Sequence, residues 1–225
     1  MYELIDRLKQ KQWLWQGSDT PTSSNRFPTG FELLDRKLDG GLPARGVVEI
    51  QSQSGIGELR LLLPHIKAHS QQRLAVFIQP PGCLSAEMLH ASGLDLEQLL
   101  MITPTDSKQA LWAAEQCLKS GACANVLLWH PELEVHQARR LQVASEQGDC
   151  LQFLFKSERA NSFSLPVSLS LTLQPHAQGL EVTITKRKGG WSHGRFVIEM
   201  SHLWPGLTLN RPEPVVLPFQ LQQQG

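Results

Sequence analysis

Residues 52–59, with the sequence SQSGIGEL, lie where a phosphate-binding loop would carry out nucleotide chemistry. The residues before them, 47–50, predict a short strand, and residues 57–69 predict a helix. A loop that joins a strand to a helix can hold phosphate when it carries glycines, a lysine and a serine or threonine. The position is therefore that of a nucleotide site, and its side chains decide what the site can do.

Most of the residues that such a loop needs are replaced. Aligned from the strand without gaps, Ser52 stands at the first glycine, Gly57 is kept, Glu58 stands at the lysine and Leu59 at the magnesium-binding hydroxyl. The lysine normally neutralises charge on the β- and γ-phosphates. A carboxylate repels them instead, and two like charges about 4 Å apart cost roughly 4 kcal/mol at an effective dielectric of about 20. Such a cost weakens binding about a thousandfold.

The rest of the chain alternates between predicted strands and helices. Strands are predicted at 73–79, 99–103, 125–129 and 150–155, and helices at 31–38, 83–92, 106–120 and 132–147. This alternation predicts an α/β fold of parallel βαβ units, with helices on both faces of the sheet. Period-two segments at 167–174, 180–187 and 195–200 predict an antiparallel meander that extends the sheet.

Three segments resemble RecA-type recombinases. PTGFELLDRKLDGGLPARGVVEI, residues 28–50, is similar to the stretch that leads into their phosphate loop, and residues 91–129 and the strand EVTITKRKGG are similar to later parts of the same core. The resemblance covers about residues 27–200. It implies a RecA-like three-layer core with a mainly parallel sheet, extended by C-terminal antiparallel strands. The expected division is an N-terminal helix and arm at 1–26, a core at 27–203 without a functional phosphate-binding loop, and a Pro-rich tail at 204–225.

The other groups of a nucleotide-hydrolysing site are missing as well. Trp129 and His130 stand where a strand should end in a magnesium-binding aspartate, and Gln79 with two prolines stands where a glutamate should activate water. Lys156 replaces the glutamine-type sensor that the resemblance implies. Loss of phosphate clamp, metal ligand and base together predicts no ATPase activity, no cofactor and no metal. Trp129 either caps the core or contacts a partner, and a lone histidine such as His130 is more often structural than a ligand.

Within the RecA-like proteins, the chain is similar to two families that are not recombinases. GELRLLLP, ASGLDLEQLL and ASEQGDCLQFLF match both ImuA, an accessory protein of SOS-induced mutagenic translesion synthesis, and SulA, the SOS inhibitor of cell division. SulA-like chains are shorter and lack most of PTGFELLD…GGLP and the last strands, so these segments favour ImuA.

The ImuA resemblance implies a non-catalytic adaptor. Its partners would be RecA, an inactive Y-family-like protein of the ImuB type and an error-prone DnaE-type polymerase. The alternative is a SulA-like inhibitor that binds FtsZ and blocks septation. A residual RecA-like ATPase is a weaker third possibility.

Two groups of residues are candidates for partner binding. Trp13 and Trp15 lie in the predicted arm, where they either pack against the core or anchor a partner, since tryptophan is enriched at interface hot spots. A basic cluster lies around a predicted hairpin turn and consists of Lys186, Arg187, Lys188 and Arg195. It is either a solvated turn or a contact to phosphate or a partner, and so few charges allow at most weak, salt-sensitive DNA binding.

Composition narrows the class of protein. Lys plus Arg and Asp plus Glu balance at 21 each, so no global charge draws the chain to nucleic acid or membrane. The four cysteines form no CxxC pair and are expected to be reduced and structural. No segment reads as a secretory signal or reaches the ~18 apolar residues that a membrane span needs. A cytoplasmic protein is expected, and homo-oligomerisation remains open.

Overall fold

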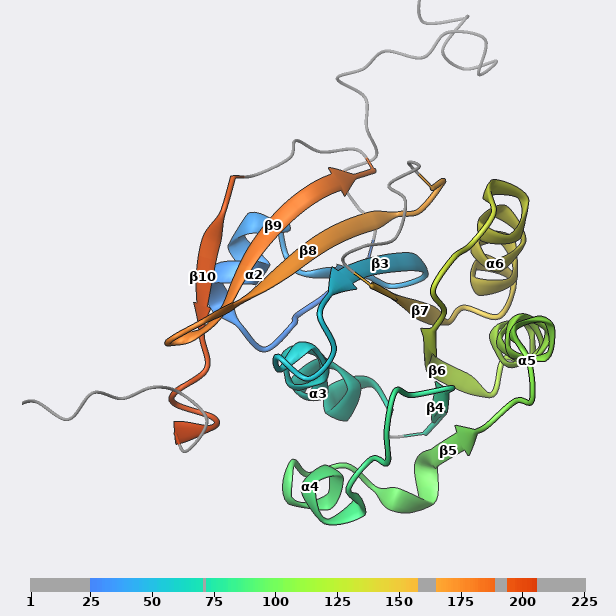
Figure 1. Ribbon diagram of the computed structural model, residues 1–225, viewed down its shortest axis with the longest axis horizontal. Helices are drawn as coiled ribbons and strands as arrows, with labels where there is room; N and C mark the ends of the chain where they lie inside the picture. Colours follow the sequence, from blue (N-terminus) through green and yellow to red (C-terminus); the bar gives the residue numbers. More distant parts are fainter. Residues whose placement is uncertain (1–24, 71, 158–164, 189–193, 206–225) are drawn as a thin grey trace, which may run out of the picture.

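The computed structural model describes residues 25–70, 72–157, 165–188 and 194–205. Nearly all of the expected arm, with Trp13 and Trp15, and of the expected tail therefore lies outside the described residues. Within them, one sheet contains eight strands (Figure 1), in the order β10 (Phe196–Glu199), β9 (Gly179–Arg187), β8 (Leu169–His176), β3 (Gly46–Ser52), β7 (Leu151–Ser157), β6 (Cys123–Trp129), β4 (Leu74–Ile78) and β5 (Leu99–Ile102).

The sheet is mainly parallel, which confirms the predicted fold class. Strands β5, β4, β6, β7 and β3 pair in parallel. Strands β8, β9 and β10 form the predicted antiparallel meander. The meander joins the rest of the sheet through β8, which lies parallel to β3 with Val48 opposite Leu169, and the sequence pattern did not predict this pairing. Strand β8 therefore has one parallel neighbour, β3, and one antiparallel neighbour, β9. A period-two pattern indicates a half-buried strand but carries no information about its direction.

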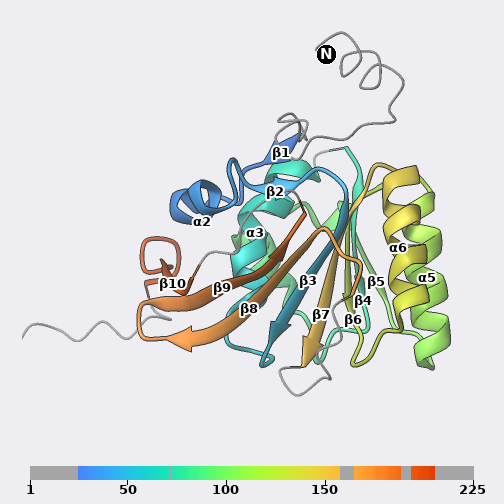
Figure 2. The same cartoon turned by 90° about the horizontal axis from the view of Figure 1, so that it is seen from above.

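Helices cover both faces of the sheet (Figure 2). On one side lie α2 (Glu32–Lys37), α3 (Glu58–His69) and α4 (Ala86–Ala91), and on the other lie α5 (Ser107–Lys119) and α6 (Val135–Gln147). Successive strand residues point to opposite faces. Val48 and Ile50 accordingly belong to the core under α3, and Val47 belongs to the core under α5 and α6.

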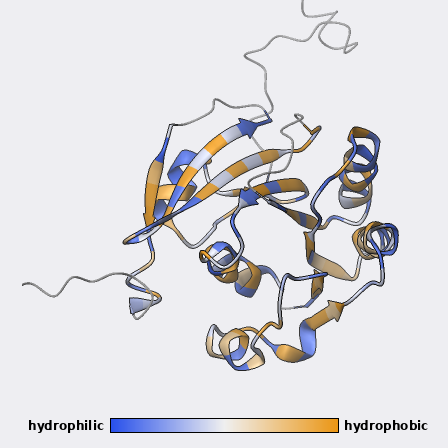
Figure 3. Ribbon diagram, viewed as in Figure 1, coloured by the Kyte–Doolittle hydropathy of each residue, from blue (hydrophilic) through white to orange (hydrophobic). Residues whose placement is uncertain are grey.

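The predicted helix at 106–120 is confirmed in detail. Asp106 caps α5, because its side chain accepts a hydrogen bond from the Gln109 amide at 2.8 Å. Ala114 and Leu118 are fully buried, as expected for the inner stripe. The outer side of this helix is polar, and Figure 3 shows hydrophobic and hydrophilic residues alternating along α5 and α6.

Residues 28–43, the first segment that resembles RecA, form a compact unit that precedes β3. Strand β1 (Arg26–Phe27) pairs with β2 (Leu42–Pro43), a pair that the sequence pattern did not predict. Gly41 has a positive φ, 115°, and a Cβ there would lie 2.1 Å from the Phe27 carbonyl oxygen. Thr29 donates a hydrogen bond through Oγ1 to Asp35 at 2.7 Å. The TG and LD pairs of the resemblance are therefore joined to each other, and they fix the start of α2.

The 3₁₀ turn η1 (Leu96–Gln98) leads into β5. No helix among the described residues is long and apolar enough to cross a membrane.

Candidate functional site

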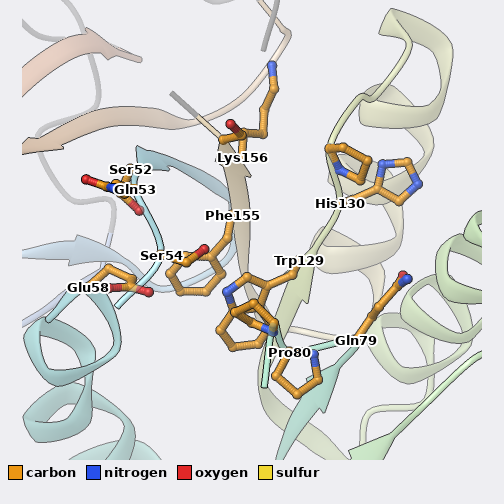
Figure 4. Close-up of a pocket in the computed structure, with 13 residues that line it drawn as sticks. Ser52, Gln53, Ser54, Glu58, Gln79, Pro80, Trp129, His130, Phe155 and Lys156 are labelled. Atoms are coloured by element: carbon orange, nitrogen blue, oxygen red, sulfur yellow. The ribbon is translucent and has the colours of Figure 1, made fainter. Parts of the chain in front are cut away.

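A cavity of about 680 Å³ lies at the carboxyl ends of β3, β4, β6 and β7 (Figure 4). In open α/β sheets this is where ligands bind. The fold brings most of the residues singled out from the sequence to this place. The described residues that line it are Ser52, Gln53, Ser54, Glu58, Gln79, Pro80, Pro81, Trp129, His130, Pro131, Phe155, Lys156 and Ser157. Gly57 and Leu59 line a second cavity of about 360 Å³ that shares Ser54, Glu58, Pro81 and Trp129 with the first.

Glu58 fills the phosphate-binding loop with its own carboxylate. The Gly55 amide donates to Glu58 Oε1 at 2.9 Å and to Oε2 at 3.1 Å, and the Gly57 amide donates to Oε2 at 3.1 Å. Both glycines have positive φ, 86° and 111°, so that their amides turn towards one point. Glu58 is only 6% exposed. Amides that would bind a phosphate in a working loop are therefore already bonded to an anion.

Leu59, at the position of the magnesium-binding hydroxyl, is half-buried and packs against the core beneath α3. Its side chain has no oxygen to offer a metal. Glu58 is the only carboxylate among the described residues that line the main cavity. The loop keeps the backbone shape of an anion site and lacks the side chains that would hold magnesium and a nucleotide.

Trp129 is part of an aromatic stack at the floor of the cavity. Its ring lies 4.4 Å from that of Phe155, with an angle of 5° between the planes, and 6.4 Å from that of Phe77. Phe155 is opposite Trp129 in the parallel pair of β6 and β7, which explains the close contact. Trp129 is half-buried, so it packs against the core and also borders the cavity. The geometry agrees with a core-capping aromatic residue, and it leaves a role in partner contact open to test.

His130 is buried on the other side of the cavity, 6% exposed. Neither ring nitrogen forms a hydrogen bond of normal geometry with a described residue. Burial lowers the pKa of His130, although the nearby backbones of Glu132 and Ser107 oppose this. Among the described residues, no group of three His, Cys, Asp or Glu side chains is placed to hold a metal ion.

Gln79 occupies the position of the missing glutamate. Its backbone has φ 56°, a left-handed value that costs energy for a residue other than glycine. The backbone N–H of Gln79 donates to the Ile102 carbonyl oxygen at 3.0 Å. The side-chain oxygen of Gln79 is buried without a hydrogen bond to a described residue. A carboxamide cannot take up a proton from water as a general base does.

Lys156 forms a buried ion pair that the sequence did not reveal. Its Nζ lies 3.1 Å from Glu49 Oε1, and the side chains are 6% and 12% exposed. The Ser170 hydroxyl donates to the other carboxylate oxygen at 2.6 Å. Glu49 stands opposite Leu154 on β7 and opposite Ser170 on β8, so only the register of three strands brings these groups together. The alternation of polar residues on the strands was the one available signal.

The basic cluster is largely engaged within the fold. Arg187, whose side chain is 5% exposed, forms an ion pair with Asp39. Lys186 donates to the Leu165 carbonyl oxygen, and Arg195 lies 3.6 Å from Glu181. Lys188 is exposed. These residues lie on and beside β9, far from the carboxyl ends of β4 and β6, so the fold does not join them to the cavity.

The chain is similar to two kinds of protein. Residues 42–152 match a family model described as "Cell division inhibitor SulA". RecA from Frankia alni is 31% identical over 136 residues, which are 59% of this chain and 38% of that protein, and RecA from Clavibacter michiganensis is 32% identical over 136 residues, 36% of its length. This chain thus spans well under half of the RecA proteins that it matches.

Among solved structures, the chain is similar to SulA from Pseudomonas aeruginosa, with 25% identity and a TM-score of 0.43 over 49% of this chain and 97% of that one. It is the family model that supports a SulA-like segment at residues 42–152, and the chain is distantly similar to RecA.

Proposed function

We propose that this protein acts in the bacterial SOS response by binding a protein partner in the cytoplasm, without catalysis. The observation that carries the proposal is the Glu58 carboxylate, which occupies the amides of the phosphate-binding loop. A nucleotide would have to displace this internal anion and then meet a site without a lysine. Phosphoryl transfer needs a residue that binds the phosphates, one that binds the metal ion and one that acts as a base. At these three positions the cavity has Glu58, Trp129 and Gln79, respectively.

The first candidate activity is inhibition of cell division through binding of FtsZ. The match of residues 42–152 to the family described as cell division inhibitor SulA supports it. That segment includes the filled loop, both helices of the α5/α6 layer and the strands from β3 to β6. All of the elements that surround the cavity begin within it.

The second candidate is an adaptor in mutagenic translesion synthesis, of the ImuA type. The observation that favours it is the set of strands β8, β9 and β10, which lies beyond the matched segment and is joined to it through β3. The compact unit at residues 28–43, with its Thr29–Asp35 hydrogen bond, adds a second RecA-like element before the segment. An adaptor would bind RecA, an ImuB-type protein and a DnaE-type polymerase.

One experiment separates these candidates. The tagged full chain is incubated in parallel with purified FtsZ, RecA, an ImuB-type protein and a DnaE-type polymerase from the same bacterium. Capture of FtsZ, together with filamentous cells on overproduction, supports the first candidate. Capture of RecA or the ImuB-type protein, without filamentation, supports the second. Capture of none of the four rejects the proposed function.

The non-catalytic part of the proposal has its own test. Purified protein should release no phosphate from ATP above the level of a blank. Turnover that disappears on substitution of Ser52, Gly57 or Glu58 would show that the loop still works and would overturn this part.

A further inference from the structure

The outer face of helices α5 and α6 carries an exposed tryptophan. Trp112 on α5 is 64% exposed, the largest value for a big apolar side chain among the described residues, and Val143 on α6 is 61% exposed. Trp112 lies off the buried stripe of α5, to which Ala110 and Ala114 belong. An exposed indole offers a large apolar surface and a polar N–H group to a second molecule.

A small groove lies beside this tryptophan, between the two helices. It has a volume of about 150 Å³, and the described residues around it include Leu111, Trp112, Gln137 and Leu141. The groove is smaller than the roughly 300–1,000 Å³ typical of small-molecule sites. It suits a single apolar side chain, because Leu111 and Leu141 are its apolar residues beside the indole.

Two cations, Lys108 and Arg140, and one carboxylate, Glu115, line the groove. Glu115 is the nearest carboxylate, and Lys119 at 2.5 Å and Arg140 both bind it, so that these cations hold the pKa of Glu115 below its usual value. Arg140 keeps a side chain that is 62% exposed. The other exposed cations of the two helices are Lys119 and Arg139, and Glu146 is an exposed carboxylate near the end of α6. Two further exposed carboxylates, Glu132 and Glu134, lie before α6 and line the neighbouring cavity with Lys108.

We propose that the α5/α6 face, defined by Lys108, Leu111, Trp112 and Arg140, binds an acidic segment of a partner protein. One apolar side chain of this segment enters the groove beside Trp112, and its carboxylates pair with the surrounding cations. Tryptophan and arginine are the residues most enriched at interface hot spots. The inference rests on the proposed function only in that the chain works by binding a protein, and it adds the surface and the chemistry of the partner.

A protein segment fits this surface better than nucleic acid does. Single-stranded nucleic acid is bound by a row of aromatic side chains along a basic groove. Among the described residues the α5/α6 face has a single tryptophan and a small groove, and the net charge of the chain is zero. A peptide with one apolar side chain between carboxylates would contact both the apolar groove and the cations that line it.

The test measures the affinity of the full chain for a fluorescent peptide of Asp and Glu residues around a central leucine pair. Substitution W112A, or the pair K108A with R140A, should weaken binding about tenfold or more, as loss of a hot spot does. Raising the salt concentration should weaken it too, because the cations are exposed. The matched control is L203A, an apolar residue that is 43% exposed and lies next to Trp204, which packs on the α3 side of the sheet.

Two companion ligands decide what the surface recognises. A peptide in which glutamines replace the acidic residues should bind more weakly than the acidic peptide. If the W112A protein binds the acidic peptide as tightly as the unchanged protein, the proposal is overturned. If oligothymidine binds through Trp112 and the acidic peptide does not, the face is a nucleic-acid site, and the proposal is overturned as well.

The same variants in the partner capture experiment keep this inference separate from the proposed function. If the unchanged protein and W112A capture the same partner equally, the proposed function stands and the α5/α6 face is rejected. If neither captures any of the four partners while the acidic peptide still binds through Trp112, the surface stands and the proposed function is rejected.

Discussion

The cavity end of the sheet and the α5/α6 face treat their binding groups in opposite ways. At the cavity, the loop amides bond to Glu58, Lys156 bonds to Glu49, and Trp129 stacks on Phe155. On the α5/α6 face, Trp112 and Arg140 are mostly exposed. The loop amides and Lys156 at the cavity are bonded within the chain, whereas Trp112 and Lys108 on the α5/α6 face are turned to solvent. Satisfied groups should matter for stability, and outward groups should matter for binding.

The largest expected effect is at the buried ion pair. Glu49→Ala leaves the Lys156 ammonium buried without its carboxylate, and it should lower the free energy of unfolding by about 3–5 kcal/mol. Unfolding in urea, followed by circular dichroism, measures this. The double variant Glu49→Leu with Lys156→Met removes both charges and should recover most of the loss. A single variant as stable as the original would mean that the pair contributes little.

The next largest effect is a dependence of the free energy of unfolding on pH, caused by His65 on the buried side of α3. Burial, and then the neighbouring His69, lower the pKa of His65 to about 4. The unfolded chain takes up this proton near pH 6.5, so stability should fall as pH drops from about 6.5 to about 4, by up to roughly 3 kcal/mol. Below pH 4 this contribution should level off, because His65 is then protonated in both states.

The control for the pH effect is a variant of the histidine itself. His65→Asn should flatten the pH dependence of the free energy of unfolding. Equal slopes for the original protein and the His65 variant would contradict the assignment.

The filled loop should give a smaller effect. Glu58→Ala removes hydrogen bonds from two amides to a carboxylate and should cost about 2 kcal/mol, the usual range for bonds to a charged group. Hydrogen exchange at the Gly55 and Gly57 amides should speed up at the same time. Glu87→Ala, in the exposed first turn of α4, is the matched control and should change neither quantity appreciably.

The smallest effect on stability is expected at the α5/α6 face. Trp112→Ala should change the free energy of unfolding by no more than about 0.5 kcal/mol, since the side chain is mostly exposed. The same variant is expected to lose binding of the acidic peptide. A large loss of stability in this variant would contradict the view that Trp112 serves binding rather than stability.

The sequence predicted the elements well and the contacts between them poorly. Hydrophobic periodicity located the helices and strands, and the motif spacing placed Glu58 at the end of the loop. It could not show that the Glu58 side chain turns back onto Gly55, which depends on the backbone of both glycines. Nor could it join Glu49 to Lys156, because that pair follows from strand register.

Exposure of Trp112 could have been read from the helix itself. Leu111, Ala114 and Leu118 are spaced so that they share one face of a helix at 106–120. Residue 112 lies off this apolar face. The direction of β8, by contrast, depends on where the chain crosses after β7, and no local pattern encodes that.

The ion pair at the centre of the sheet also bears on how short this protein could be. Glu49 is bonded to Lys156 on β7 and to Ser170 on β8, so one carboxylate ties together strands on either side of β3. A chain that stopped after β7 would turn β3 into an edge strand and expose its unpaired amides and carbonyls to neighbouring molecules. The last three strands are thus part of what keeps the central sheet soluble, and removing them should produce aggregation before it produces a smaller working protein.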